Sequence, residues 1–88
     1  MRVDPRHSRA WYNLGLALNG QGQVEAALAA LVQGEQANPQ DAGIPYAAAT
    51  IYARLGRKAE AVAATQRALV ANPGMREAME LRMALEQR

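Results

Sequence analysis

The sequence predicts an all-α fold built from repeated pairs of antiparallel helices, and three observations support this. Proline recurs every 34 residues, at Pro5, Pro39 and Pro73, and Asp or Asn precedes each of them. Alanine, the best helix former, supplies 20 of the 88 residues. Larger apolar residues between the prolines recur at helical spacing. A fixed period of this length is typical of helical arrays in which neighbouring repeats bury each other's apolar faces.

The first period reads as two helices joined by a glycine turn. Ser8 is a suitable N-cap for the first helix, and Gly20 and Gly22 are expected to end it. The second helix is predicted from about Val24 to Ala37. It stops at Asn38-Pro39, because a proline restricts the residue before it to extended conformations.

The second period repeats this arrangement. Asp41 is expected to cap a third helix that ends near Gly56, which places Pro45 in the first turn, where its missing N–H costs least. A fourth helix is predicted from Arg57 or Lys58 to Ala71, before Asn72-Pro73. A fifth is expected to begin near Met75 and continue to the C-terminus.

These residues resemble the tetratricopeptide repeat family, a 34-residue helix-turn-helix with the pattern W-x2-L-G-x2-Y, then A-x3-F, A and P. The first repeat matches at Trp11, Leu14, Gly15, Leu18 (for Tyr), Ala27, Leu31 (for Phe), Gly34 (for Ala) and Pro39. The second matches at Ala48 (for Leu), Ala49 (for Gly), Tyr52, Ala61, Ala68 and Pro73. It departs from the pattern at Pro45 for Trp and at Thr65 for Phe.

The resemblance implies a right-handed superhelical array of five helices that forms one domain. Its expected parts are a tail of a preceding repeat or linker (1–7), the first repeat (8–41), the second repeat (42–75) and a C-terminal capping helix (76–88). Small residues at Gly15, Ala27, Ala49 and Ala61 are expected to let paired helices approach closely. Larger side chains are expected to fill the remaining gaps, namely those of Trp11, Leu14, Leu18, Leu31, Tyr52 and Leu69. Asp4-Pro5 stands where an upstream repeat would end, so we expect the chain to be a fragment of a longer protein.

Composition argues against several classes of function. Ten Lys and Arg against eight Asp and Glu give a weak field, so neither nucleic acid nor membrane is an expected partner. There is no cysteine, and His7, placed before the first helix, is the only histidine. We therefore expect no enzyme activity, no metal and no cofactor. Cytoplasm and periplasm are both compatible with the composition, and the preference for arginine over lysine favours a GC-rich bacterial genome.

A non-catalytic scaffold for protein–protein interaction is the function that the resemblance implies. In this family the first helix of each repeat lines a concave groove for a peptide or partner helix. The expected groove residues here are Arg9, Tyr12, Leu16, Asn19, Tyr46, Thr50 and Arg54. The two tyrosines occupy the same position of the two repeats and suit contact with a partner, although packing between helices explains them equally well. The two arginines can pair with acidic groups or remain solvated surface residues.

One subset of the family clamps a C-terminal carboxylate with Lys and Asn on its groove helices. Tyr12 and Leu16 occupy those positions here. The resemblance therefore does not extend to the binding of chaperone tails.

Methionine recurs at i, i+4 and i+8 in the fifth helix, at Met75, Met79 and Met83. This stripe adjoins the expected packing face formed by Ala78, Leu81 and Leu85. It is either filler against the second repeat or a contact surface for another chain, because methionine adapts to varied partners. The alternative function is therefore a structural module that self-associates, or docks, through the ends of the array.

Overall fold

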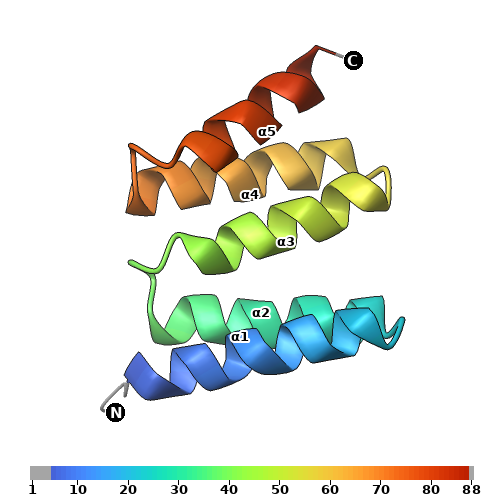
Figure 1. Cartoon of the computed structure of the whole chain (residues 1–88), viewed down its shortest axis with the longest axis vertical. Coiled ribbons are helices and arrows are strands. Elements are labelled where there is room, and N and C mark those ends of the chain that lie inside the picture. The colour runs from blue at the N-terminus through green and yellow to red at the C-terminus, as the bar shows by residue number, and fades with distance from the viewer. Residues whose placement is uncertain (1–4, 88) are drawn as a thin grey trace. The chain divides into compact units, whose positions relative to one another are not determined.

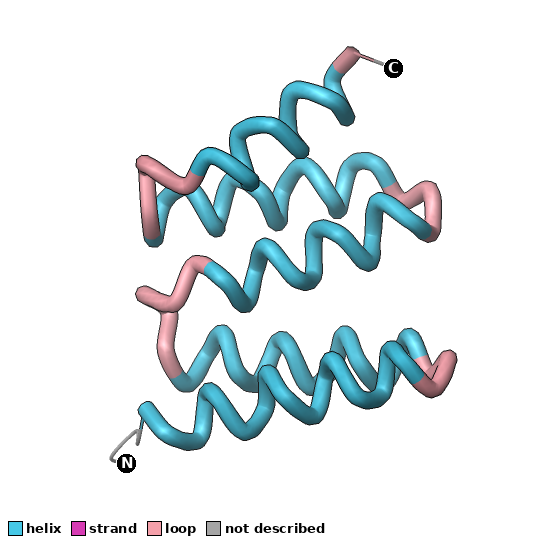
Figure 2. Tube along the Cα trace, in the orientation of Figure 1, coloured by secondary structure: helices cyan, strands magenta, loops and turns pink. Residues whose placement is uncertain are grey.

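The computed structural model of the chain describes residues 5–87, and that range contains five helices and no strand (Figure 1). Short turns join the helices within each hairpin (Figure 2). The chain divides into two compact units, residues 1–39 and 40–88, so the boundary directly follows Pro39. The predicted all-α fold is confirmed.

The first unit is a helical hairpin of α1 (Pro5–Gly20) and α2 (Val24–Ala37). The two helices run antiparallel and pack on each other (Figure 1). The packed stripe of α1 is narrow, because Ser8 and Gly15 are the only buried residues between 7 and 20. Gly15 lies on this stripe, where a Cβ atom would come within 2.9 Å of Leu31. The predicted close approach of paired helices at a small residue is therefore confirmed for this hairpin.

The start of α1 differs from the prediction. The helix begins at Pro5, so Ser8 is not its N-cap and His7 does not precede it. Proline suits the first helical position, because its φ is already helical and the N–H that it lacks would have no partner there. Ser8 instead lies within α1 with 2% of its surface exposed, and His7 is an exposed helical residue. Residues 1–4, part of the predicted tail, lie outside the described residues.

The turn after the first helix of each hairpin has the same geometry in both units. Gly22 has a φ of +83° and Gly56 a φ of +76°, the left-handed region that glycine enters most readily. The following N–H donates back to a helix carbonyl, from Gln23 to Leu18 and from Arg57 to Tyr52, at 2.9 Å in both cases. These bonds satisfy carbonyls that the helix end would otherwise leave unpaired. The glycine turns predicted by the 34-residue period are confirmed.

The second unit contains α3 (Gly43–Arg54), α4 (Lys58–Ala71) and α5 (Arg76–Glu86). Helices α3 and α4 form the second hairpin, and α5 packs on α4 and also contacts α3. A small core joins the three elements; it consists of Ala42, Ala68 and Ala78, with Tyr46, Leu69, Ala71 and Met75 packed against it.

Two predictions about α3 can be compared with its first turn. Pro45 is its third residue, as expected. Asp41 precedes the N-cap, which is Ala42, yet its Oδ1 accepts a hydrogen bond from the N–H of Gly43 at 3.1 Å. The carboxylate therefore satisfies a free donor of the helix start from one residue further out than predicted.

The role predicted for two large side chains of α1 is wrong. Trp11 is 38% exposed and Leu14 is 44% exposed, so neither fills a gap between helices. Alanine and glycine at the contact bring the backbones together instead, which leaves no room for large side chains on that stripe. Of the other predicted gap fillers, Leu31 is buried as expected, and Leu18, Tyr52 and Leu69 are half-buried.

Within residues 5–87, none of the helices combines the length and the apolar character that a membrane span requires.

Candidate functional site

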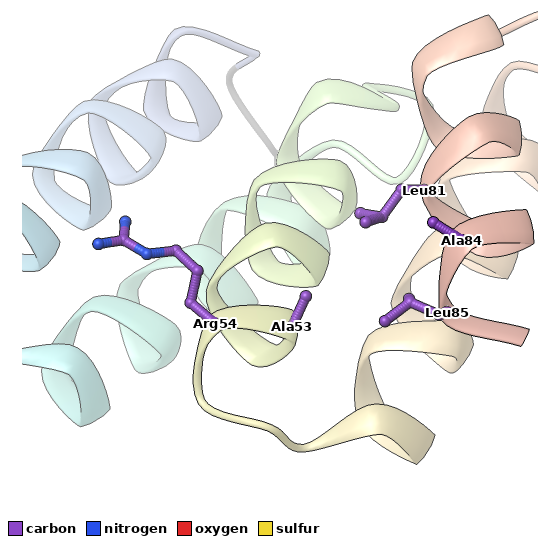
Figure 3. Close-up of a pocket in the computed structure, with 5 residues that line it drawn as sticks. All are labelled: Ala53, Arg54, Leu81, Ala84 and Leu85. Atoms are coloured by element: carbon purple, nitrogen blue, oxygen red, sulfur yellow. The ribbon is translucent and has the colours of Figure 1, made fainter. Parts of the chain in front are cut away.

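A pocket with a volume of about 230 Å³ lies between the C-terminal half of α3 and α5 in the second unit. Its lining residues are Ala53, Arg54, Leu81, Ala84 and Leu85 (Figure 3). Most of the lining is aliphatic, so the pocket suits an apolar side chain rather than an ion or a polar cofactor.

Helical spacing on α5 explains the apolar wall. Leu81 and Leu85 are four residues apart and therefore share one face of the helix. Ala78, one turn earlier, is fully buried in the core and fixes α5 against the hairpin. The space remains open because Ala53, the residue of α3 opposite the leucines, ends at its Cβ atom (Figure 3).

Arg54 gives the pocket its one charged boundary. It is the last residue of α3 and is exposed. Figure 3 shows its side chain extending away from Leu81 and Leu85, so the guanidinium lies outside the apolar space. The structure records no hydrogen bond or ion pair between Arg54 and the other described residues. A ligand that fills the pocket with an apolar group can therefore reach an available cation with a neighbouring group.

The other two groove residues predicted on α3 are already engaged within the unit. Tyr46 is half-buried and packs against Ala42, Ala68 and Ala78. The hydroxyl of Thr50 donates to the carbonyl of Ala47 at 2.7 Å. Of the three residues predicted here, only Arg54 lines the pocket.

The four groove residues predicted on α1 lie in the first unit. Helical spacing places Arg9, Tyr12, Leu16 and Asn19 along one side of α1. The guanidinium carbon of Arg9 lies 5.0 Å from the ring centre of Tyr12, a cation–π geometry that orders both side chains. Leu16 is 42% exposed, whereas Tyr12 and Asn19 are half-buried.

The pocket residues of α5 were not predicted as a site. Leu81 and Leu85 were assigned to packing, because an apolar pair at i and i+4 on a short amphipathic helix usually faces a core. Both are half-buried, so they do pack, but each also lines the pocket. Only the small size of Ala53 and Ala84 signals the gap, and alanine is too abundant in this chain for that signal to stand out.

The methionine stripe divides in two. Met75 is half-buried and contributes to the core of the second unit. Met79 and Met83 are 42% and 58% exposed.

Among residues 5–87 no group of His, Cys, Asp or Glu is placed to hold a metal ion.

Models of the tetratricopeptide repeat match residues 1–42 and 46–74, which together are most of the chain. No curated protein has a sequence that matches significantly.

Solved structures are similar over almost the whole length. The first TPR of Spaghetti (RPAP3), bound to the HSP90 peptide SRMEEVD, is 25% identical with a TM-score of 0.89, covering 97% of this chain and 69% of that one. The second TPR of Spaghetti, bound to the same peptide, is 18% identical with a TM-score of 0.87, covering 94% and 77%, and shows a likeness in fold alone. A chain of the APC/C hetero-tetramer Cut9-Hcn1 is 25% identical with a TM-score of 0.86, covering 97% of this chain and 16% of that one.

Proposed function

Because the chain belongs to the tetratricopeptide repeat family, whose members are protein-interaction modules, we propose that it binds a peptide segment of a partner protein in the predicted groove. An apolar side chain of that segment occupies the pocket between α3 and α5. The chain itself performs no catalysis, as is typical of this family.

The pocket carries this proposal. Its aliphatic lining rewards the burial of a side chain such as Leu or Met, at about 25 cal/mol for each Å² removed from water. Arg54, which lines the pocket and extends from it, favours an acidic residue beside that apolar anchor. The expected ligand is therefore a segment in which Leu or Met is followed or preceded by Asp or Glu.

Two further observations support a peptide ligand. Both TPR domains of Spaghetti are bound to a peptide in the structures similar to this one. On α1, Arg9 and Tyr12 form an ordered pair with Leu16 exposed beside them, a mixture of charge, aromatic area and aliphatic area that suits peptide contact.

The test fills the pocket without disturbing the core. Ala84 is exposed, so Ala84→Leu adds bulk to the pocket wall, while Ala63→Leu adds the same bulk at an exposed position of α4. Short fluorescein-labelled peptides that combine one Leu or Met with neighbouring Glu residues are titrated with each protein, and anisotropy is measured. We expect the unchanged chain and Ala63→Leu to bind the same peptides, and Ala84→Leu to bind them at least tenfold more weakly.

A second variant tests the charge. Arg54→Gln is expected to weaken binding of the acidic peptides. It should not change binding of the same peptides with Gln in place of Glu. Equal binding by the unchanged chain and Ala84→Leu would remove the pocket from the proposal, and no binding to any peptide of the set would remove the ligand class.

A further inference from the structure

Met83 of α5 occupies a position that is buried by helix packing in both α1 and α3. In the 34-residue register it corresponds to Gly15 and Ala49. Both are buried, and Gly15 lies directly against Leu31 of α2. Met83 is 58% exposed, and Met79 one turn earlier is 42% exposed. Helix α5 thus has an uncovered apolar strip, Met79 and Met83. The strip lies on the face that corresponds to the α2-packing face of α1.

Helix α1 carries the second uncovered strip. Trp11 and Leu14 are 38% and 44% exposed, although the corresponding residues of α3, Pro45 and Ala48, are buried. The two strips are chemically matched, because methionine sulfur makes favourable contacts with aromatic rings. Each is short and helical, so one can lie along the other.

The charges around the two strips are opposite in sign. Helix α1 contains no acidic residue, and its Arg9 is exposed. In α5, Arg82 pairs with Glu86 at 3.5 Å, while Glu77 and Glu80 are exposed and Arg76 is the only other cation of the helix, so α5 carries a net negative charge. Glu80 lies between the two exposed methionines in sequence. Like strips would therefore repel, whereas α1 and α5 attract.

We propose that a second copy of this chain docks its α1 strip (Trp11 and Leu14) on the α5 strip (Met79 and Met83), so that the protein self-associates head to tail. The contact is heterologous, because the two surfaces differ. It uses neither Leu81 nor Leu85, and so it does not depend on the peptide-binding pocket.

Trp11 is the only tryptophan of the chain, so its fluorescence reports the contact directly. Concentration is raised from about 5 μM to about 1 mM, a range that covers weak association. We expect the emission maximum to move to shorter wavelength as Trp11 becomes buried, and the mass from sedimentation to rise above the 9.5 kDa of one chain. Raising the salt to about 0.5 M is expected to weaken the association, because it screens the opposite charges.

Two double variants separate head-to-tail docking from other arrangements. Met79→Gln with Met83→Gln removes the α5 strip and keeps Trp11; Trp11→Gln with Leu14→Gln removes the α1 strip and contains no tryptophan. Each variant alone is expected to stay monomeric. Mixed together they retain one intact strip each, so they are expected to form a heterodimer and shift the emission of the single remaining tryptophan. A variant with all four changes, added in place of the second, is expected to cause no shift.

All four side chains are substantially exposed, so the variants are expected to keep the helical circular dichroism of the unchanged chain, which is measured alongside. The proposal is overturned if the unchanged chain remains monomeric to about 1 mM. Self-association by either double variant alone is equally fatal, because it would show that like strips pair.

Discussion

Gly15 of α1 and Leu31 of α2 meet so closely that a Cβ atom on the glycine would lie 2.9 Å from the Cγ and Cδ2 atoms of the leucine. Leu31 is 1% exposed, so it has little room to move. The second hairpin has Ala49 and Thr65 at the same two positions of the register, and both are buried. A larger residue on the first helix thus accompanies a smaller one on the second.

The effect of Gly15→Ala on stability should therefore depend on the size of the residue at position 31. Alanine adds about 1 kcal/mol of helix propensity, but overpacking against Leu31 costs about 1–3 kcal/mol. We expect Gly15→Ala to lower the free energy of unfolding by about 1 kcal/mol in the unchanged chain. In a Leu31→Thr background the same change is expected to raise it, because Thr makes room for the methyl group. Urea unfolding of the four proteins of this cycle measures both effects, and additive changes would contradict the close contact.

The left-handed glycines of the two turns provide the second prediction. Gly56→Ala is expected to lower the free energy of unfolding by about 1–2 kcal/mol, because a side chain at a φ of +76° clashes with its own backbone. Gly20→Ala is the matched control: a Cβ atom there meets nothing within 4 Å, so no loss is expected. Equal losses in the two variants would mean that the backbone conformation of Gly56 is not the cause.

The sequence predicted the number of helices and the turns between them, because the 34-residue period repeats the proline and glycine residues that set those turns. Proline and glycine act through the local backbone, so the turns at Gly22 and Gly56 and the end of α2 before Asn38 needed no tertiary information. The start of α1 was missed because Ser8 and Pro5 are both good helix starters, and only packing buries the serine. The pocket was missed for a related reason: whether Leu81 faces a core or a gap depends on the length of the side chain opposite, at Ala53.

The groove residues remain predictions, and the structure explains why some of them are more available than others for contact with a partner. A register position says which side of a helix a residue occupies, but not what that side meets. Tyr12 and Tyr46 share one position, yet Tyr12 lies beneath Arg9, whereas Tyr46 packs into the core of the second unit.

The start of α4 supports a third prediction. Arg57 donates to Glu60 through Nε at 2.6 Å and Nη2 at 2.7 Å, and its guanidinium carbon lies 5.0 Å from the ring centre of Tyr52. Both charged side chains are more than one-third exposed, so we expect Glu60→Gln to cost only about 0.5 kcal/mol and less at high salt.

The first hairpin lacks this ion pair, because Gln23 and Ala26 stand at the corresponding positions. The matched experiment therefore transplants it, as Gln23→Arg with Ala26→Glu. The double variant is expected to be more stable than the two single changes predict, by about 0.5 kcal/mol in a double-mutant cycle. A coupling energy of zero would show that the pair at α4 depends on Tyr52, whose counterpart is Leu18.

The peptide SRMEEVD, present in the structures of both Spaghetti domains, provides the last prediction. A clamp for a terminal carboxylate needs cations or amides at groove positions where this chain has Tyr12 and Leu16, and neither side chain supplies an amide or a positive charge. SRMEEVD also contains Met followed by Glu, so its internal segment fits the pocket and Arg54. We expect any binding of SRMEEVD in an anisotropy titration to come from that segment and not from its C-terminal carboxylate.

The outcome discriminates between two modes of recognition. An internal peptide with Leu or Met beside Glu needs only the aliphatic pocket and Arg54, so a longer peptide that carries Met-Glu-Glu internally is expected to bind as tightly as SRMEEVD. Replacing the free C-terminus of SRMEEVD by an amide should make no difference, because Tyr12 and Leu16 replace the groups with which the family's clamp holds the carboxylate. If SRMEEVD bound at micromolar concentration and amidation abolished that binding, a carboxylate clamp would exist on this chain, built from residues other than those the family pattern uses.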